Sequence, residues 1–351
     1  MPTIQVPPNI NAWTDMLAEG DSIIIVGSGI SPHNDIRRAL EPLALNAVYL
    51  EPDDENSRRW HTNDYLALNH HHRRNLALLT ALADTDADVI ISIDDDNFPT
   101  RTSWVTQARD WLTGPEPKST RVTSSSDGWF STGSLCFPPV VHRGTPQALR
   151  HPKYVATQHT RPIELQERVG VYEALWTGDP DIDAIERIVN DPRVDVLLGN
   201  VVLNYGTWAP FNSQATAVHR DLAPLFMMWT GVGRYDDIWC SYLMRAYMDA
   251  TNWLFACGGE PGISQVRNEH DLLKDLDAEL LGMRHTPAII DLIKSWAASE
   301  VTPMINAVDA MESFAGYIRL AARRPEFEWL LPTTVVTFST WVTDLREAMN
   351  K

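Results

Sequence analysis

The stretch Asp88-Val89-Ile90-Ile91-Ser92-Ile93-Asp94-Asp95-Asp96-Asn97 decides the fold, because an apolar run of strand length passes directly into three carboxylates. Short apolar runs bounded by polar residues are typical of buried strands. In an open α/β sheet, ligands bind beyond the carboxyl ends of the strands. Adjacent carboxylates at that position repel one another unless a cation lies between them, and oxygen ligands select Mg²⁺ or Mn²⁺. The alternative is a solvated acidic turn that caps the next helix.

The segments around this strand predict an α/β fold. Strands are expected over 22–26 and 47–50, with helices over 35–41 and 70–83 between them. Strands that alternate with helices favour a mostly parallel, Rossmann-like sheet covered on both faces. The pattern predicts further helices over 182–189 and 236–250 and is almost entirely helical from about 271. We therefore expect a catalytic domain over residues 1–275 and a helical C-terminal subdomain over 276–351, whose helices are a candidate surface for a homo-oligomer.

Composition limits the classes of partner. The chain has 46 acidic and 29 basic residues and a net charge of −17, which disfavours nucleic acid without excluding a local basic cleft. The three cysteines are widely spaced, as expected of reduced thiols in a cytoplasmic protein. No apolar run reaches the ~20 residues of a membrane-spanning helix, and the N-terminal residues do not resemble a secretory signal. These features predict a soluble cytoplasmic protein without a membrane partner.

Two polar segments precede the acidic cluster. Arg73 and Arg74, followed by Asn75, begin a predicted helix from which guanidinium groups can bind a diphosphate, although ordinary surface charge is the alternative. The three residues before them are His70 to His72. Consecutive side chains on a helix point in different directions, so we do not expect these histidines to bind one metal ion together. We interpret them instead as the start of a helix that carries positive charge near phosphates. Gly27-Ser28-Gly29 follows a strand but lacks the third glycine of a dinucleotide fingerprint, and is interpreted as a turn near the donor base.

Six segments, in order, resemble the plant STELLO glycosyltransferases. They are His72–Leu76, Val89–Asn97, His142–Pro146, Gly178–Ile185, Ala209–Thr216 and Arg234–Trp239. The chain is also similar to the reversibly glycosylated polypeptides, which include UDP-arabinopyranose mutases, and Val266–Glu269 resembles their Trp-Arg-Asn-Glu. The resemblance covers roughly residues 60–275. Departures are Thr145, where these families have Phe or Tyr, Asn97, where the second family has Cys, and the lack of a STELLO-type membrane anchor.

The resemblance implies a glycosyltransferase A-type fold that binds a nucleotide sugar, UDP-linked in these families, together with Mn²⁺ or Mg²⁺. Asp96 is the expected principal metal ligand, and Asp94 or Asp95 a second ligand or a ribose contact. His270 is a candidate further ligand, with a surface histidine as the alternative. Residues expected to contact the donor are Gly27, Arg73, Arg74, Asn75, Asp94, Asn212 and Gln214.

Asp237 is the leading candidate for a general base, because it begins an apolar helix where a carboxylate can lie in a cleft. Asp236 is the second candidate, and capping of the helix is the alternative for both. Four further residues are expected either to line an acceptor site or to stabilise local structure: Arg143, Asp179, Asp181 and Asp183.

The sequence therefore predicts a metal-dependent hexosyl- or pentosyltransferase that moves a sugar from a nucleotide-sugar donor to an unidentified hydroxyl acceptor. One alternative is a mutase that interconverts the pyranose and furanose forms of a UDP-sugar. A second is a phage-type glycosyltransferase that acts on modified DNA bases, and a third is a catalytically silent sugar-nucleotide-binding module.

Overall fold

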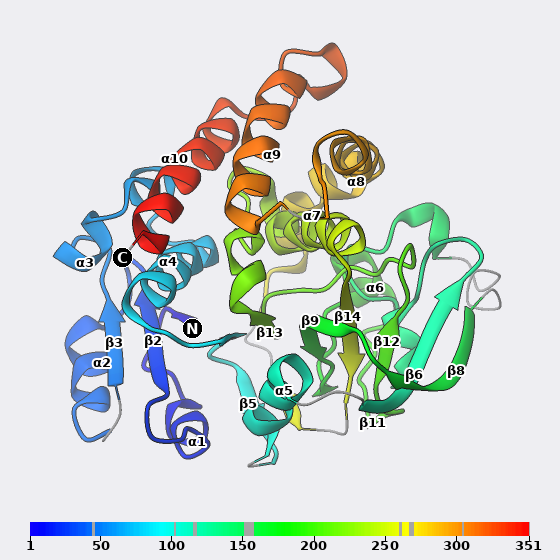
Figure 1. Ribbon diagram of the computed structural model, residues 1–351. Coiled ribbons are helices and arrows are strands. Elements are labelled where there is room, and N and C mark those ends of the chain that lie inside the picture. The colour runs from blue at the N-terminus through cyan, green and yellow to red at the C-terminus, as the bar shows by residue number, and fades with distance from the viewer. Residues whose placement is uncertain are drawn as a thin grey trace.

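The computed structural model describes all residues except 44–45, 102, 115–117, 151–157, 260–261, 267–269, 304 and 351. The segment Arg267–Glu269, part of the expected resemblance, thus lies outside the described residues. Figure 1 shows two groups of strands next to each other, with long helices along one side of both.

The larger sheet has seven strands in the order β4-β13-β9-β14-β12-β6-β8. Two neighbouring pairs, β9 with β14 and β12 with β6, are parallel, and the other pairs are antiparallel. The prediction of a mostly parallel sheet is therefore wrong for this sheet. β13 returns antiparallel between β4 and β9, and β6 and β8 form a hairpin-like edge. The strands are β4 (Val89–Ile93), β6 (Lys118–Ser125), β8 (Gln158–Leu165), β9 (Arg168–Ala174), β12 (Val201–Leu203), β13 (Ala215–His219) and β14 (Trp253–Gly258).

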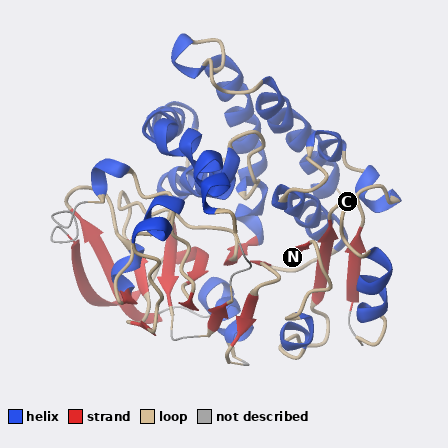
Figure 2. Ribbon diagram, turned by 180° about the vertical axis from the view of Figure 1, so that it is seen from behind, coloured by secondary structure: helices blue, strands red, loops and turns tan. Residues whose placement is uncertain are grey.

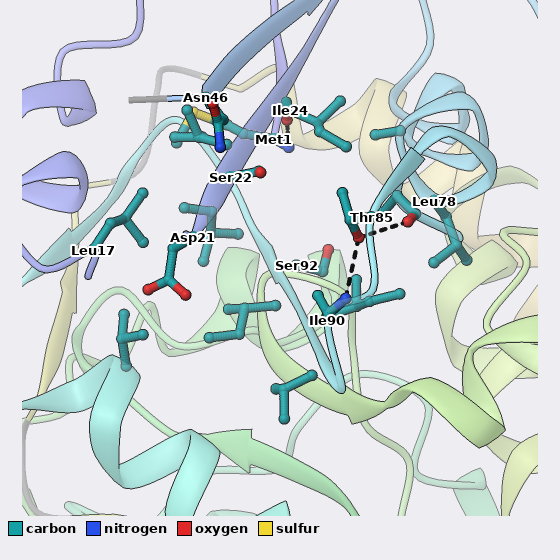
Figure 3. Close-up of a pocket in the computed structure, with 18 of the residues that line it drawn as sticks. Met1, Leu17, Asp21, Ser22, Ile24, Asn46, Leu78, Thr85, Ile90 and Ser92 are labelled. Carbon is teal, nitrogen blue, oxygen red and sulfur yellow. Dashed lines mark hydrogen bonds between the residues drawn. The ribbon is translucent and has the colours of Figure 1, made fainter. Parts of the chain in front are cut away.

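A separate parallel sheet holds β1 (Pro2–Thr3), β2 (Ser22–Gly27) and β3 (Asn46–Leu50), in the order β1-β2-β3. The predicted strands over 22–26, 47–50 and 88–93 are all observed, but no pairing joins β2 to β4 among the described residues. A cavity of about 650 Å³ lies between these two strands. Figure 3 shows side chains such as Leu17, Ile24, Leu78 and Ile90 around this cavity.

Two small sheets complete the strands. One has the order β10 (Thr177–Gly178), β15 (Ile263–Gln265), β5 (Asn97–Pro99), and the other pairs β11 (Val196–Leu197) with β7 (Cys136–Phe137). β5 begins directly after the acidic cluster and pairs with β15 so that Gln265 lies opposite Asn97. This pairing brings residues about 170 positions apart to the end of β4.

The helices confirm most of the expected segments and are arranged mainly along one side of the strands (Figure 2). They are α1 (Ile10–Thr14), α2 (His33–Leu40), α3 (Glu55–Arg58), α4 (Arg74–Asp84), α5 (Trp104–Thr113), α6 (Ala184–Val189), α7 (Asp236–Thr251), α8 (Leu272–Glu300), α9 (Ala307–Ala321) and α10 (Pro332–Met349). The predicted helix over 70–83 starts with a 3₁₀ turn, His71–Arg73, before α4. No helix in the described part of the chain has the length and apolarity to cross a membrane.

The C-terminal helices share one hydrophobic core with the centre of the molecule. Trp296, Phe314 and Trp341, from α8, α9 and α10, belong to the same buried cluster as Trp229 and Trp239. The α/β class and the C-terminal helical extension are thus confirmed, and the architecture is compatible with the expected glycosyltransferase A-type fold. The predicted domain boundary at 275/276 falls inside α8, and the division into two domains stays a prediction.

α8 packs tightly against the turn that leads into α7. Gly282 lies beneath the ring of Tyr235, so closely that a Cβ atom on the glycine would overlap it. Arg234 of the same turn donates from Nε to Glu279 of α8 at 3.1 Å. These contacts fix the position of the first residues of α7. The three cysteines, Cys136, Cys240 and Cys257, are buried and form no disulfide.

Candidate functional site

A polar cavity of about 200 Å³ lies at the carboxyl end of β4. It collects most of the predicted site residues: Arg74, Asp94, Asp95, Asp96, Arg143, Asp181, Gln214, Asp236, Asp237 and His270. His71, Ser213, Arg234 and Gln265 also line it. Side chains from seven segments of the chain therefore converge where the topology of an α/β sheet predicts a ligand site.

The acidic cluster turns away from β4 in a way that separates its three carboxylates. The amide of Asp94 donates to Gln214 O at 3.2 Å and to Asn97 Oδ1 at 3.1 Å, which ends the strand. Asp94 then accepts from Arg74, and Asp95 accepts from Thr3 Oγ1 at 2.7 Å. Asp96 accepts from Gln265 Nε2 at 3.1 Å. The three side chains therefore have different partners.

Asp96 carries the strongest sign of a cation site. Burial, followed by the neighbouring Asp94 carboxylate, raises the pKa of Asp96 to about 7. Burial likewise raises the pKa of Asp95. Oδ1 of Asp96 is buried and has no hydrogen-bond partner. A buried carboxylate oxygen without a partner, beside two further carboxylates, fits a hard divalent cation such as Mn²⁺ or Mg²⁺.

A second group of side chains has the spacing of a metal site. Ligand atoms of His70, His72 and Asp236 lie within 4.8 Å of one another, and no other group of three or more His, Cys, Asp or Glu side chains in the described ranges does so. However, His72 N donates to His70 Nδ1 at 3.3 Å, and Ala67 N donates to His72 Nε2 at 3.0 Å. A neutral ring whose one nitrogen accepts a hydrogen bond carries its proton on the other. A metal ion here would therefore require both backbone hydrogen bonds to break, and the acidic cluster is the better cation site.

Of Arg73, Arg74 and Asn75, which were expected to contact the donor, only Arg74 reaches the cavity. Its guanidinium donates to Asp94, Ser92 Oγ and Ser213 O. Arg73 is 1% exposed and points the other way, with Nε donating to Gly27 O at 3.2 Å. Asn75 is buried and exchanges two hydrogen bonds with the backbone of Met228, at 2.8 and 2.9 Å. The contacts of Arg73, Asn75 and Gly27 are structural in this conformation.

A buried ion network forms the floor of the cavity. Arg143 Nε and Nη2 donate to the two carboxylate oxygens of Asp181 at 2.9 and 3.0 Å, and Nη1 and Nη2 reach those of Asp237 at 3.1 and 3.3 Å. All three side chains are 5% exposed. Burial acts against the charged forms, but the neighbouring carboxylates raise the pKa of Arg143 well above its usual range, and Arg143 lowers the pKa of Asp181. Gly144 has φ +89°, and a Cβ there would lie 2.5 Å from Ile238 Cγ2, so the loop after Arg143 approaches α7 closely.

The two acids at the start of α7 have different surroundings. Asp237 accepts hydrogen bonds from Arg143, from Ser213 N and Oγ at 3.2 and 3.3 Å, and from Ile238 N at 2.9 Å. Asp236 is 1% exposed, and its Oδ2 lies 2.6 Å from Nε2 of His71. Burial alone would raise the pKa of Asp236, but His71, with smaller effects of His70 and His72, holds it well below its usual range. The N-cap residue of α7 is Tyr235, which makes no side-chain capping bond, and of the two acids only Asp237 accepts from a backbone amide of the first turn.

The remaining predicted residues divide between the cavity and the scaffold. Gln214 accepts from Gln265 at 3.1 Å, and His270 Nδ1 lies 3.0 Å from Asp275. Asn212 Oδ1 accepts from Gln214 N at 2.8 Å, which matches the alternative of a turn. Two acids outside the cavity, Asp179 and Asp183, have structural partners. Asp179 pairs with Arg187 and Arg193, and Asp183 caps α6 by accepting from Glu186 N at 2.9 Å.

Sequence reasoning missed three contributors to this region. Gln265 has no motif of its own and is placed by the β5–β15 pairing. His71 was not distinguished from its two histidine neighbours. Glu173 lies beneath the ion network on β9 and is 2% exposed, with Oε1 accepting from Asn212 N at 3.1 Å and burial raising its pKa well above its usual range. A glutamate inside the apolar run Val169–Ala174 is the signal that could have identified it.

No protein-family model matches this chain, and no curated protein matches it. Among solved structures, the chain is similar to the mannosyltransferase PcManGT from Pyrobaculum calidifontis in complex with GDP-Man and Mn²⁺. The identity is 14%, the match covers 97% of this chain and 84% of that chain, and the TM-score is 0.36. Similarity at this level assigns no activity, so the function rests on the cavity itself.

Proposed function

We propose that this protein is a glycosyltransferase that moves a sugar from a nucleotide-sugar donor to a hydroxyl acceptor, with Mn²⁺ or Mg²⁺ as cofactor. The observation that carries the proposal is the unpartnered, buried Oδ1 of Asp96 in a cavity that also holds Arg74 and Arg143. A nucleotide diphosphate bears negative charge that an acidic protein can bind only where cations are concentrated. The order of the STELLO-like segments supports the same reaction, with a UDP-linked hexose or pentose as the expected donor.

Each part of the cavity has a proposed role. Asp96, assisted by Asp95 or Asp94 and with His270 at the rim, would hold the cation, and the bound cation would supply positive charge that stabilises the departing diphosphate. Arg74 lies beside Asp94 and provides a second positive charge for that group. Gln214 and Gln265 offer amides suited to sugar hydroxyls. Asp236 and Asp237 place two buried carboxylates at the start of α7, where their negative charge would stabilise the protonated form of the group that takes the acceptor's proton.

Calorimetric titration of UDP- and GDP-sugars, with Mn²⁺ and then with excess chelator, tests the proposal. We expect measurable affinity only with the metal ion, and we expect Asp96→Ala to remove the metal dependence. Asp110→Ala is the matched control, because Asp110 is an exposed acid of α5 outside the cavity. Affinity that is unchanged in chelator would contradict the cation site, and absence of binding for every nucleotide sugar would contradict the function.

The alternatives give different products. A mutase would exchange the ring forms of UDP-arabinose without net transfer. A phage-type enzyme would label DNA that carries hydroxymethylated bases, and a silent binding module would bind a nucleotide sugar without turning it over. Product analysis by NMR and an acceptor screen that includes such DNA distinguish these outcomes.

A further inference from the structure

The middle histidine of the tract, His71, is placed unlike its neighbours. Its side chain is 40% exposed and lines the cavity, whereas His72 is buried. Burial lowers the pKa of His70 to about 4 and that of His72 to about 3, so both rings are neutral at pH 7. His71 is therefore the one ring of the three that both faces the cavity and can change its charge near neutral pH.

His71 is coupled to a buried anion. Nε2 of His71 lies 2.6 Å from Oδ2 of Asp236, which is 1% exposed. Burial by itself lowers the pKa of His71, but Asp236, with a smaller effect of Asp237, raises it above the ordinary 6.5, and the nearby Arg74 lowers it slightly. Neither oxygen of Asp236 accepts a hydrogen bond from the described residues, so its buried charge acts on His71 through this ion-pair contact and stabilises the protonated ring.

The other nitrogen of His71 is available for chemistry. Nδ1 makes no hydrogen bond or ion pair with the part of the chain that the structure describes. By contrast, both oxygens of Asp237 accept hydrogen bonds from Arg143, and further donors come from Ser213 and Ile238. Both oxygens of Asp237 are thus occupied by donors, whereas Nδ1 of His71 is not. The accessible base of this cavity is an imidazole.

We propose that His71 is the catalytic base of this site and that Asp236 is its positioning residue. The inference rests on the proposed glycosyl transfer. Nδ1 of neutral His71 takes the proton of the acceptor hydroxyl while Nε2 keeps its proton towards Asp236. The acceptor oxygen forms a bond to the anomeric carbon, the bond from that carbon to the diphosphate oxygen breaks, and its electron pair leaves with the diphosphate. Because this is one base-assisted displacement, the anomeric configuration inverts.

Slow hydrolysis of a nucleotide sugar, with water as the acceptor, provides a test without knowledge of the natural acceptor. We expect His71→Gln to lower kcat by ~10²–10⁴-fold, which is the usual contribution of a positioned base. The affinity for the nucleotide sugar should stay within a few-fold of that of the wild type. His285→Gln, on α8 and outside the cavity, is the matched control. An unchanged kcat in His71→Gln would overturn the proposal, and a wild-type protein that neither binds nor hydrolyses nucleotide sugars would instead overturn the proposed function.

The pH profile separates a positioning role from a structural one. Rate should rise with pH through the pKa of His71, because only the neutral ring accepts a proton. Asp236→Asn removes the charge that raises this pKa, so the acid limb should move to lower pH while kcat falls. If Asp236 has only a structural role, Asp236→Asn will be less stable than the wild type but will keep the acid limb of its pH–rate profile at the same pH. That result would contradict the assignment.

Three measurements on the wild-type protein keep the proposal testable where a variant fails to fold. NMR titration of the His71 ring in the wild-type protein, without substrate, should give a pKa above 6.5. Modification of wild-type histidines with diethyl pyrocarbonate, followed by mass spectrometry, should show loss of hydrolysis in step with modification of His71. Full activity after complete modification of His71 would overturn the proposal. The released sugar, observed by NMR before it mutarotates, should have the inverted configuration, and retention would also overturn it.

Discussion

Arg143 and Asp181 form a two-point ion pair, Nε to Oδ1 at 2.9 Å and Nη2 to Oδ2 at 3.0 Å, although the two residues are 38 positions apart. Asp237 shares the same guanidinium group. One buried arginine thus balances two buried carboxylates, and the loop before α6, the loop after β7 and the start of α7 meet at this point.

Removal of the arginine should therefore destabilise the protein. Arg143→Met leaves two buried carboxylates without a cation, and loss of one partner from a buried ion pair costs about 3–5 kcal/mol. Arg143→Lys should recover only part of this loss, because an ammonium group cannot make the same paired contacts. Urea unfolding measures the difference. Equal stability of the wild-type protein and Arg143→Met would show that the network contributes nothing to the fold.

The metal site should depend on pH. Since Asp96 has a pKa of about 7 without metal, in place of 3.8 in the unfolded chain, a divalent cation must displace its proton below pH 7. Mn²⁺ affinity should rise with pH up to about 7 and then level off. Calorimetry in two buffers of different ionisation enthalpy measures the released proton. Asp96→Asn should release none, and proton release that persists in this variant would place the titrating group elsewhere.

The same shift predicts how the metal-free protein responds to pH. The folded state binds a proton at Asp96 that the unfolded state has already lost between pH 3.8 and about 7. The contribution of Asp96 to stability should therefore fall as pH rises through this range. Comparison of wild type and Asp96→Asn by thermal unfolding at several pH values isolates this effect. A contribution of Asp96 to stability that increases as pH rises through this range would contradict this prediction.

Asp237→Asn distinguishes the roles of the two acids of α7. We expect reduced stability, because an amide cannot replace both charge-assisted contacts with Arg143, and only a small shift of the acid limb of the pH–rate profile to lower pH. The larger shift is expected in Asp236→Asn, because Asp236 raises the pKa of His71 more than Asp237 does. A loss of the limb in Asp237→Asn alone would identify Asp237, the original candidate, as the base.

Asp183 should behave as a structural residue. Its side chain accepts from Glu186 N at the start of α6 and also pairs with Arg150. Loss of a helix-capping side chain costs about 0.5–2 kcal/mol, and the buried ion pair adds to this. Asp183→Ala should therefore lower the midpoint of urea unfolding while leaving nucleotide-sugar affinity unchanged. A loss of affinity without a loss of stability would return Asp183 to the acceptor site.

Local patterns predicted the parts of the fold that depend on neighbouring residues. The apolar runs of β2, β3 and β4 and the helical period of α7 are properties of short segments, and so is the position of Asp94–Asp96 at a strand end. The order of the strands in the sheet depends instead on contacts between distant segments of the chain. β13 pairs with β4 through contacts between residues more than 120 positions apart, and no local pattern in the segment 115–220 specifies that pairing.

For the candidate site, too, the sequence predicted local features but not the directions of the side chains. Arg73 and Arg74 look equivalent in the sequence, yet the helix turns one towards Gly27 and the other towards Asp94. His70, His71 and His72 differ only in direction, and this direction depends on the 3₁₀ turn before α4. Residue types could therefore be predicted, but the choice among adjacent identical side chains required the tertiary structure.

The contact between Gly282 and Tyr235 limits how this protein can change during evolution. A hydrogen atom is the only side chain that position 282 accepts beneath the aromatic ring, so even an alanine there requires the ring to shift. Because Tyr235 immediately precedes Asp236, such a shift would be transmitted to the carboxylate that contacts His71. We therefore expect homologues to keep this glycine and aromatic pair together or to exchange both at once, so that a position on α8, far in sequence from the acidic cluster, evolves under the constraint of the site.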